Sequence, residues 1–82
     1  MKINLVDITD IKDNSKWISF NGQDTSYNNA VRCNIAIKKD NITDVIFRTT
    51  NKVEIYNDTN VYNLTFKSLL NTDKVLRKCL KI

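Results

Sequence analysis

Apolar and polar residues alternate with a period of two along most of the segment 30–67. Successive side chains of a strand point to opposite faces, so this alternation predicts a half-buried sheet. The connections between the alternating runs are short and rich in Asn, Asp, Lys and Thr, which indicates an antiparallel meander. The four strands predicted here are Ala30–Lys38, Ile42–Thr49, Lys52–Tyr56 and Val61–Phe66.

Two further strands are predicted before this segment, at Lys2–Ile8 and Lys16–Phe20. In the second of them, Ile18 and Phe20 share one face, and Trp17 and Ser19 lie on the other face. The dipeptide Asn21-Gly22 is typical of a hairpin turn, and we expect it to turn the chain.

Polar residues dominate two other stretches near the start of the chain. Asp7, Asp10 and Asp13 are expected to lie in a polar connection between the first two strands. Carboxylates spaced in this way can bind a hard cation, but the spacing is not that of a calcium loop, so we interpret them as loop residues. The polar run Gln23–Asn29 is the longest predicted loop, and Tyr27 within it is a candidate exposed aromatic contact.

The last segment, Ser68–Ile82, fits two structures. Val75, Leu76, Cys79 and Leu80 form one helical stripe, and Asn71 or Thr72 is a suitable cap. Leu76, Leu80 and Ile82 also fit one face of a strand. We prefer a short helix, with Asp73 near its positive end.

These patterns predict one small domain over residues 1–82, mostly β, with a C-terminal helix as its only helical element. An antiparallel sheet of five to six strands is expected, either as a compact barrel or as a curled sheet. Many Ile, Val and Thr and a single glutamate support strands over helices. The predicted core consists of Val31, Cys33, Ile35, Val45, Phe47, Val53, Ile55, Leu64 and Phe66.

Few residues suited to catalysis are present. The chain of 82 residues has no histidine, one glycine and two cysteines. It therefore lacks the commonest general base and any glycine-rich phosphate loop, and two thiols without histidine cannot complete a zinc site. Cys33 and Cys79 are expected to be buried and reduced, although their pairing stays open. Glu54, the only glutamate, is expected at a solvent-facing strand position. We predict a protein that is not an enzyme and has no metal or cofactor.

Positive charge gathers at the end of the chain. Lys and Arg number 13, Asp and Glu number 9, and the formal net charge is +4. Residues 1–73 hold nine of each sign, so the whole excess comes from Lys74, Arg77, Lys78 and Lys81. On a helix these four would share one face, which is either a solvated surface or a contact for phosphates or an acidic protein.

Taken together, these features predict a small protein that binds a macromolecular partner without catalysis. The candidate binding residues are Lys74, Arg77, Lys78, Lys81 and Tyr27, and a sheet edge or the Gln23–Asn29 loop offers other docking surfaces. A phage or mobile-element accessory protein is expected from size and composition, as an inhibitor of a host defence complex or a virion assembly component. The alternative is a small-barrel nucleic-acid-binding module. A protein partner, self-association through a sheet edge, a cytoplasmic location and no membrane contact are also expected.

Overall fold

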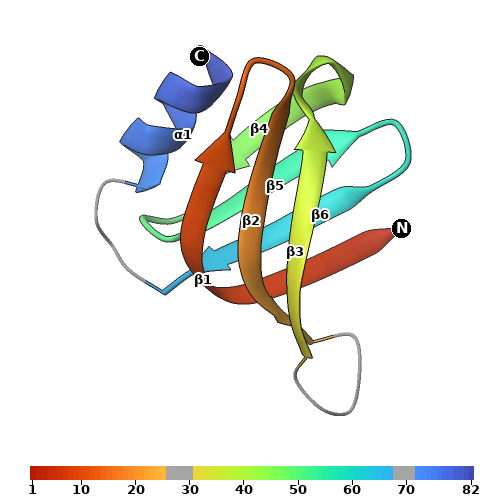
Figure 1. Cartoon of the computed structure of the whole chain (residues 1–82), viewed down its shortest axis with the longest axis vertical. Coiled ribbons are helices and arrows are strands. Elements are labelled where there is room, and N and C mark those ends of the chain that lie inside the picture. Colours follow the sequence, from red (N-terminus) through yellow and green to blue (C-terminus); the bar gives the residue numbers. More distant parts are fainter. Residues whose placement is uncertain (26–30, 68–71) are drawn as a thin grey trace.

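The computed structural model describes residues 1–25, 31–67 and 72–82. These residues form six strands, one α-helix and one 3₁₀ turn (Figure 1). In chain order they are β1 (Lys2–Asp13), β2 (Trp17–Asp24), β3 (Val31–Lys38), the 3₁₀ turn η1 (Lys39–Asn41), β4 (Ile42–Phe47), β5 (Lys52–Asn57), β6 (Val61–Phe66) and α1 (Thr72–Leu80). The prediction of a mostly β fold with a short C-terminal helix is confirmed.

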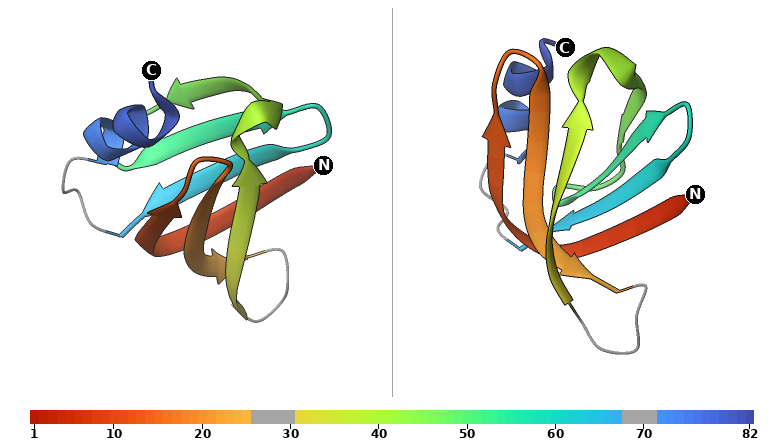
Figure 2. Two further views of the ribbon diagram at one scale, coloured as in Figure 1. Left: turned by 45° about the horizontal axis from the view of Figure 1, so that its top comes forward. Right: turned by 45° about the vertical axis from the view of Figure 1, so that its right-hand side comes forward.

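The strands form one sheet in the order β3-β2-β1-β6-β5-β4. Two antiparallel three-stranded units, β1–β3 and β4–β6, are joined by a parallel pairing of β1 with β6. The sheet is therefore mixed: its pairings are antiparallel, as predicted, except for the parallel pairing of β1 with β6, which was not predicted. The sheet curls without closing, so the curled alternative describes it better than the barrel (Figure 2).

The predicted four-stranded meander over residues 30–67 is wrong between its first and second strands. β3 and β4 are consecutive in the chain, yet they lie at the two opposite edges of the sheet. β3 instead pairs with β2 along its whole length, and the three-residue turn η1 crosses from one edge to the other. Short connections indicated adjacent strands, but curling of the sheet lets a short turn join its two edges.

Strand β1 is longer than predicted and bends sharply (Figure 1). Its first part pairs with β6 and its second part with β2, and both ladders shift register next to Asp7, which has a φ of 51°. A register shift of this kind marks a β-bulge, whose extra residues bend a strand and increase its twist. The prediction that Asp7, Asp10 and Asp13 lie in a connecting loop is therefore wrong, because all three belong to β1.

Gly22 lies inside β2, opposite this bend, so the predicted turn at Asn21-Gly22 is also wrong. A Cβ atom on Gly22 would stand 2.7 Å from the carbonyl oxygen of Val6 and 2.9 Å from side-chain carbons of Leu5 and Ile8. The only glycine of the chain is needed for this close backbone approach rather than for a turn.

The core lies on the concave side of the sheet. Four predicted core residues are buried (Val53, Ile55, Leu64 and Phe66), and four more are partly buried against them (Cys33, Ile35, Val45 and Phe47). Val31 was expected in the core but is 47% exposed, because it begins an edge strand with a neighbour on one side only. The core also contains residues outside that predicted list, which are Leu5, Ile8, Ile18, Phe20, Ile37, Tyr62 and Leu76.

Helix α1 packs with Leu76 fully buried, while Val75 from the predicted stripe is 40% exposed. The helix ends at Leu80 and is followed by Lys81, whose φ is 58°. The amides of Lys81 and Ile82 donate to the carbonyls of Lys78 and Arg77, which is the pattern of a Schellman cap. Of the two predicted caps, Thr72 is the first residue of the helix and Asn71 lies outside the described residues.

Candidate binding surfaces

The outer edge of β3 presents unpaired backbone groups. β3 pairs with β2 from Val31 to Lys38 without a register shift, and the amide of Lys39 donates to the carbonyl of Lys16 at 2.8 Å. Because antiparallel bonding alternates along a strand, the odd-numbered residues bond β2 and the even-numbered ones face away. No strand among the described residues pairs with that side. The residues whose backbone faces the free edge are Arg32, Asn34, Ala36 and Lys38.

The other edge strand, β4, is protected against pairing with a further strand. β4 has six residues against eight in β3, and its register shifts between Ile42 and Asp44. The amide of Arg48 donates to the carbonyl of Lys52, so by the same alternation the even-numbered residues of β4 bond β5. The amide of Val45 therefore points away from β5. That amide donates to the carboxylate of Asp44 at 2.9 Å. A short strand, a bulge and charged side chains are devices that discourage edge pairing. β3 is longer and has no bulge, and its only charged side chains are Arg32 and Lys38.

Side chains along β3 differ between its two faces. On the convex face Arg32, Asn34, Ala36 and Lys38 are exposed. On the concave face burial increases along the strand, from exposed Val31 through partly buried Cys33 and Ile35 to Ile37, which is 1% exposed. The part of this apolar face that lies nearest the start of β3 is therefore incompletely covered.

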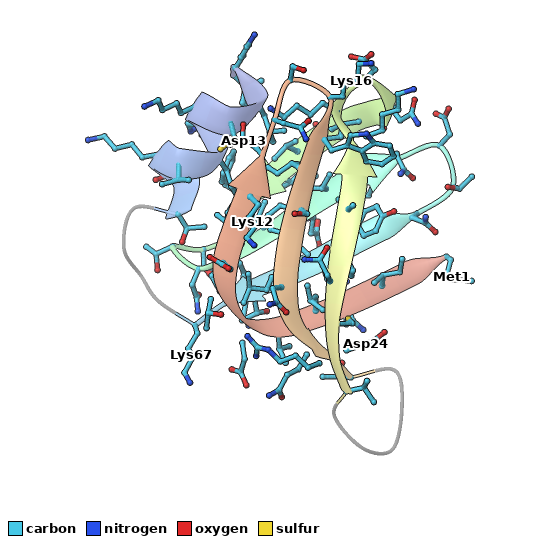
Figure 3. All side chains as sticks on the ribbon, viewed as in Figure 1. Met1, Lys12, Asp13, Lys16, Asp24 and Lys67 are labelled. Carbon is cyan, nitrogen blue, oxygen red and sulfur yellow. The ribbon has the colours of Figure 1, made fainter. Side chains whose placement is uncertain are left out.

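Of the four basic residues predicted to share one helical face, Lys74, Arg77 and Lys78 lie on α1, and Lys81 follows its last residue. Lys74, Arg77, Lys78 and Lys81 are all exposed, and Figure 3 shows nitrogen-tipped side chains of α1 extending away from the sheet. Arg77 differs from the three lysines because its guanidinium lies 4.4 Å from the centre of the Phe47 ring and 3.9 Å from the Asp73 carboxylate. Among the described residues the three lysines form no ion pair, although Lys78 lies near Asp13, whereas Arg77 also attaches the helix to Phe47 of β4.

Asp13 connects three parts of the fold. Its carboxylate lies at the end of β1 near α1 (Figure 3), where it accepts a hydrogen bond from Nζ of Lys39 at 3.0 Å and another from the thiol of Cys79. The bond from Lys39 lowers the pKa of Asp13, and nearby Lys78 lowers it further. The residue that sequence placed in a loop therefore holds η1 and α1 against β1.

Glu54 is not simply solvated, although that was expected. Its Oε1 accepts hydrogen bonds from Nε of Arg48 at 3.0 Å and from the Tyr56 hydroxyl at 2.9 Å, and its side chain is 22% exposed. These donors lower the pKa of Glu54. The group is a carboxylate held between two partners on the β4–β5 hairpin, which is a structural arrangement rather than a poised acid.

Both thiols are free. Cys33 pairs across the ladder with Gly22, whereas Cys79 contacts Asp13, which pairs with Ile18 farther along β2. At about 3.3 Å per residue, this separation exceeds the reach of a disulfide. Burial raises the pKa of both thiols, so neither is an activated nucleophile.

The predicted loop contact and the possible cation site are not found among the described residues. Tyr27 and most of the Gln23–Asn29 loop lie outside the described residues, while Gln23 and Asp24 belong to β2. Within the described ranges, no three His, Cys, Asp or Glu side chains gather as metal ligands would. The free edge of β3 was missed as a specific surface, since the strand order that creates it leaves no local pattern.

Comparison with protein-family models, curated proteins and solved structures finds no match. In the part of the chain that the structure describes, no helix has the length and apolar character needed to cross a membrane.

Proposed function

We propose that this is a non-catalytic binding protein that docks a protein partner through the free edge of β3. The observation that supports this is the contrast between the two edges of the same sheet. β4 is short, bulged and bonded by its own Asp44, whereas β3 runs unbulged beside β2 and leaves its outer backbone groups open. An added strand would satisfy these groups and gain affinity from main-chain hydrogen bonds.

A nucleic-acid-binding module is the second candidate, and the exposed lysines of α1 favour it. Lys74, Lys78 and Lys81 have no ion pair in the structure's described residues, so they are available to phosphates. The rest of the chain argues against this role, because residues 1–73 carry equal numbers of positive and negative side chains. Nucleic-acid binders usually carry a basic stripe across the binding face.

The setting that we propose is that of an accessory protein of a phage or mobile element, which inhibits a host complex or joins a virion. Small size and a composition rich in Asn, Lys and Ile support this setting. A cytoplasmic site of action is supported by two free thiols, since cysteines of cytosolic proteins are kept reduced.

A pair of variants at Ala36 tests the docking mode. Ala36→Pro removes an amide that faces the free edge and leaves the bonds from β3 to β2 in place, and proline is tolerated at such edge positions. Ala36→Ser is the matched control, because it keeps the amide and changes the side chain slightly. Both variants and the parent would be used to capture partners from cells of the source organism, with and without nuclease treatment.

We expect the same protein to be retained by the parent and by Ala36→Ser and to be lost from Ala36→Pro. Equal circular dichroism spectra and unfolding midpoints of the two variants would show that the fold is intact. Retention by all three proteins would contradict docking at β3. Capture that is abolished by nuclease and by replacing Lys74, Lys78 and Lys81 with Gln would favour the nucleic-acid module instead.

A further inference from the structure

We infer that the segment which adds to β3 is an extended acidic and apolar strand of another protein, rather than a second copy of this chain. The inference rests on the proposed docking at β3 and concerns the chemistry of the partner. It follows from the charges at the two ends of the free edge, from the uncovered apolar face of β3 and from the way β3 would pair with itself.

The charged side chains of β3 are Arg32 and Lys38, one near each end of the strand, and β3 itself contains no acidic residue. Both side chains are exposed on the convex face. The guanidinium of Arg32 donates to the hydroxyl of Thr9 at 3.0 Å, which is a neutral partner. Across the ladder, Gln23 stands opposite Arg32 and Trp17 stands opposite Lys38, so β2 brings no compensating charge there.

Of the acidic groups near this edge, Asp10 shares the convex face but lies in the row of Asn21 and Asn34, between the two charged positions of β3. Asp24 pairs with Val31 and acts on the thiol of Cys33, on the concave side of the sheet. Asp13 is bonded to Lys39, and Asp40 follows in η1. An added strand would therefore meet two positive charges on its convex face, and acidic residues opposite them would be favoured.

On the concave face, an added strand would be favoured by apolar side chains. Val31 is 47% exposed, and Cys33 and Ile35 are only partly buried. Side chains of an added strand that alternate with the acidic ones would lie beside these three residues and extend the core. β-branched residues suit this position because they pack well on a pleated surface.

A second copy of β3 satisfies these requirements poorly. Free-edge backbone groups lie on even-numbered residues, so two copies can pair antiparallel only when even residues face even residues. Of the two registers that pair most of the strand, one places Arg32 opposite Lys38 of the other copy. The second places Arg32 opposite Ala36 and diagonal to Lys38. Like charges in such cross-strand positions are destabilising.

A synthetic peptide supplies the probe. Acetyl-Glu-Val-Thr-Ile-Thr-Val-Glu-amide, paired antiparallel, places its two Glu residues opposite Lys38 and Arg32 and its apolar residues beside Ile37, Ile35 and Cys33. Two matched peptides carry Gln or Lys in place of both Glu residues. Binding to the ¹⁵N-labelled full chain would be followed by amide shifts and by amide hydrogen exchange of Asn34 and Ala36.

We expect the Glu peptide to slow exchange of these two amides and to bind about 2- to 30-fold more tightly than the Gln peptide, the range for two cross-strand charge pairs. The Lys peptide should bind most weakly. The preference for Glu should shrink in high salt and disappear in a variant that combines Arg32→Gln and Lys38→Gln.

Equal binding of the Glu and Gln peptides would overturn the acidic partner and leave strand addition at β3 standing. Slow exchange of the Asn34 and Ala36 amides that depends only on protein concentration, with dimers in light scattering, would assign the edge to a second copy and overturn the inference. If no peptide changes these amides, the inference is also wrong. The capture experiment with the Ala36 variants then decides the proposed function independently.

Discussion

Gly22 shows how one residue can be read in two ways. Asn-Gly is a strong hairpin signal, yet here the glycine sits mid-strand, where the bend of β1 brings the Val6 carbonyl to within 2.7 Å of the place of a Cβ atom. We expect Gly22→Ala to lower the free energy of unfolding by about 1–3 kcal/mol, as overpacked sites do. Urea unfolding would measure the change, with Gln23→Ala on the outer face as control. Equal stability of the two variants would show that the bend relaxes freely.

Ile35 and Ile37 lie on the same face of β3, and alternation alone places both in the core. The structure separates them, because Ile37 is 1% exposed and Ile35 is only partly buried at the free edge. We expect Ile37→Ala to cost about 2–5 kcal/mol, the range for a buried isoleucine, and Ile35→Ala to cost clearly less. Chemical denaturation of both variants gives the comparison. An equal loss would mean that the edge strand is covered in solution.

Asp13 makes stability depend on pH. Its pKa is lowered mainly by the hydrogen bond from Lys39, so the folded state favours the carboxylate. A lowered pKa contributes stability above the ordinary carboxyl value, about 4, and this contribution is lost as the pH falls through the lowered pKa.

Asp13→Asn should therefore unfold at lower urea concentration than the parent at neutral pH, and the difference should shrink in acid. Lys39→Gln, which removes the donor of the same bond, should behave in the same way. A difference between parent and variant that stays constant from pH 7 to about pH 2 would contradict this role of the pair.

Individual strands follow from sequence better than their neighbours do. β4, β5 and β6 are close to the predicted ranges, because clear alternation and short Asn-rich turns fix them locally. β1 was cut short, because three aspartates interrupt its alternation around a bulge. The parallel pairing of β1 with β6 had no signal at all, since it joins segments far apart in the chain and depends on which faces the two three-stranded units bury together.

The four basic residues at the end of the chain divide into two kinds. Replacing Lys74, Lys78 and Lys81 with Gln should change stability by within about 0.5 kcal/mol for each residue, as exposed substitutions usually do, and should slow association with an anionic partner. Arg77→Gln should instead cost about 0.5–1 kcal/mol, because it removes the cation–π contact with Phe47. Thermal unfolding of the triple and single variants separates the two effects. A single Lys→Gln variant that loses more stability than Arg77→Gln would reverse this assignment.

For the molecule as a whole, the candidate surfaces were predictable to different degrees. The basic face of α1 could be predicted because helical spacing depends only on local sequence. The specific edge at β3 could not, because it exists only once the strand order is known, and residues 30–67 looked like a continuous meander. What marks β3 is the absence of a bulge and of an edge amide bonded to a neighbouring carboxylate, the two features that protect β4 at Val45 and Asp44.

The parallel pairing of β1 with β6 also has a kinetic meaning. Each three-stranded unit, β1–β3 and β4–β6, is built from contacts between neighbouring segments, but Lys2 to Ile8 must find Val61 to Phe66 across nearly the whole chain. Closing so long a loop lowers the chain entropy before the new contacts can stabilise the fold. Folding should therefore be limited by the meeting of the two three-stranded units, and the first part of β1 is the strand that joins its own unit to β6.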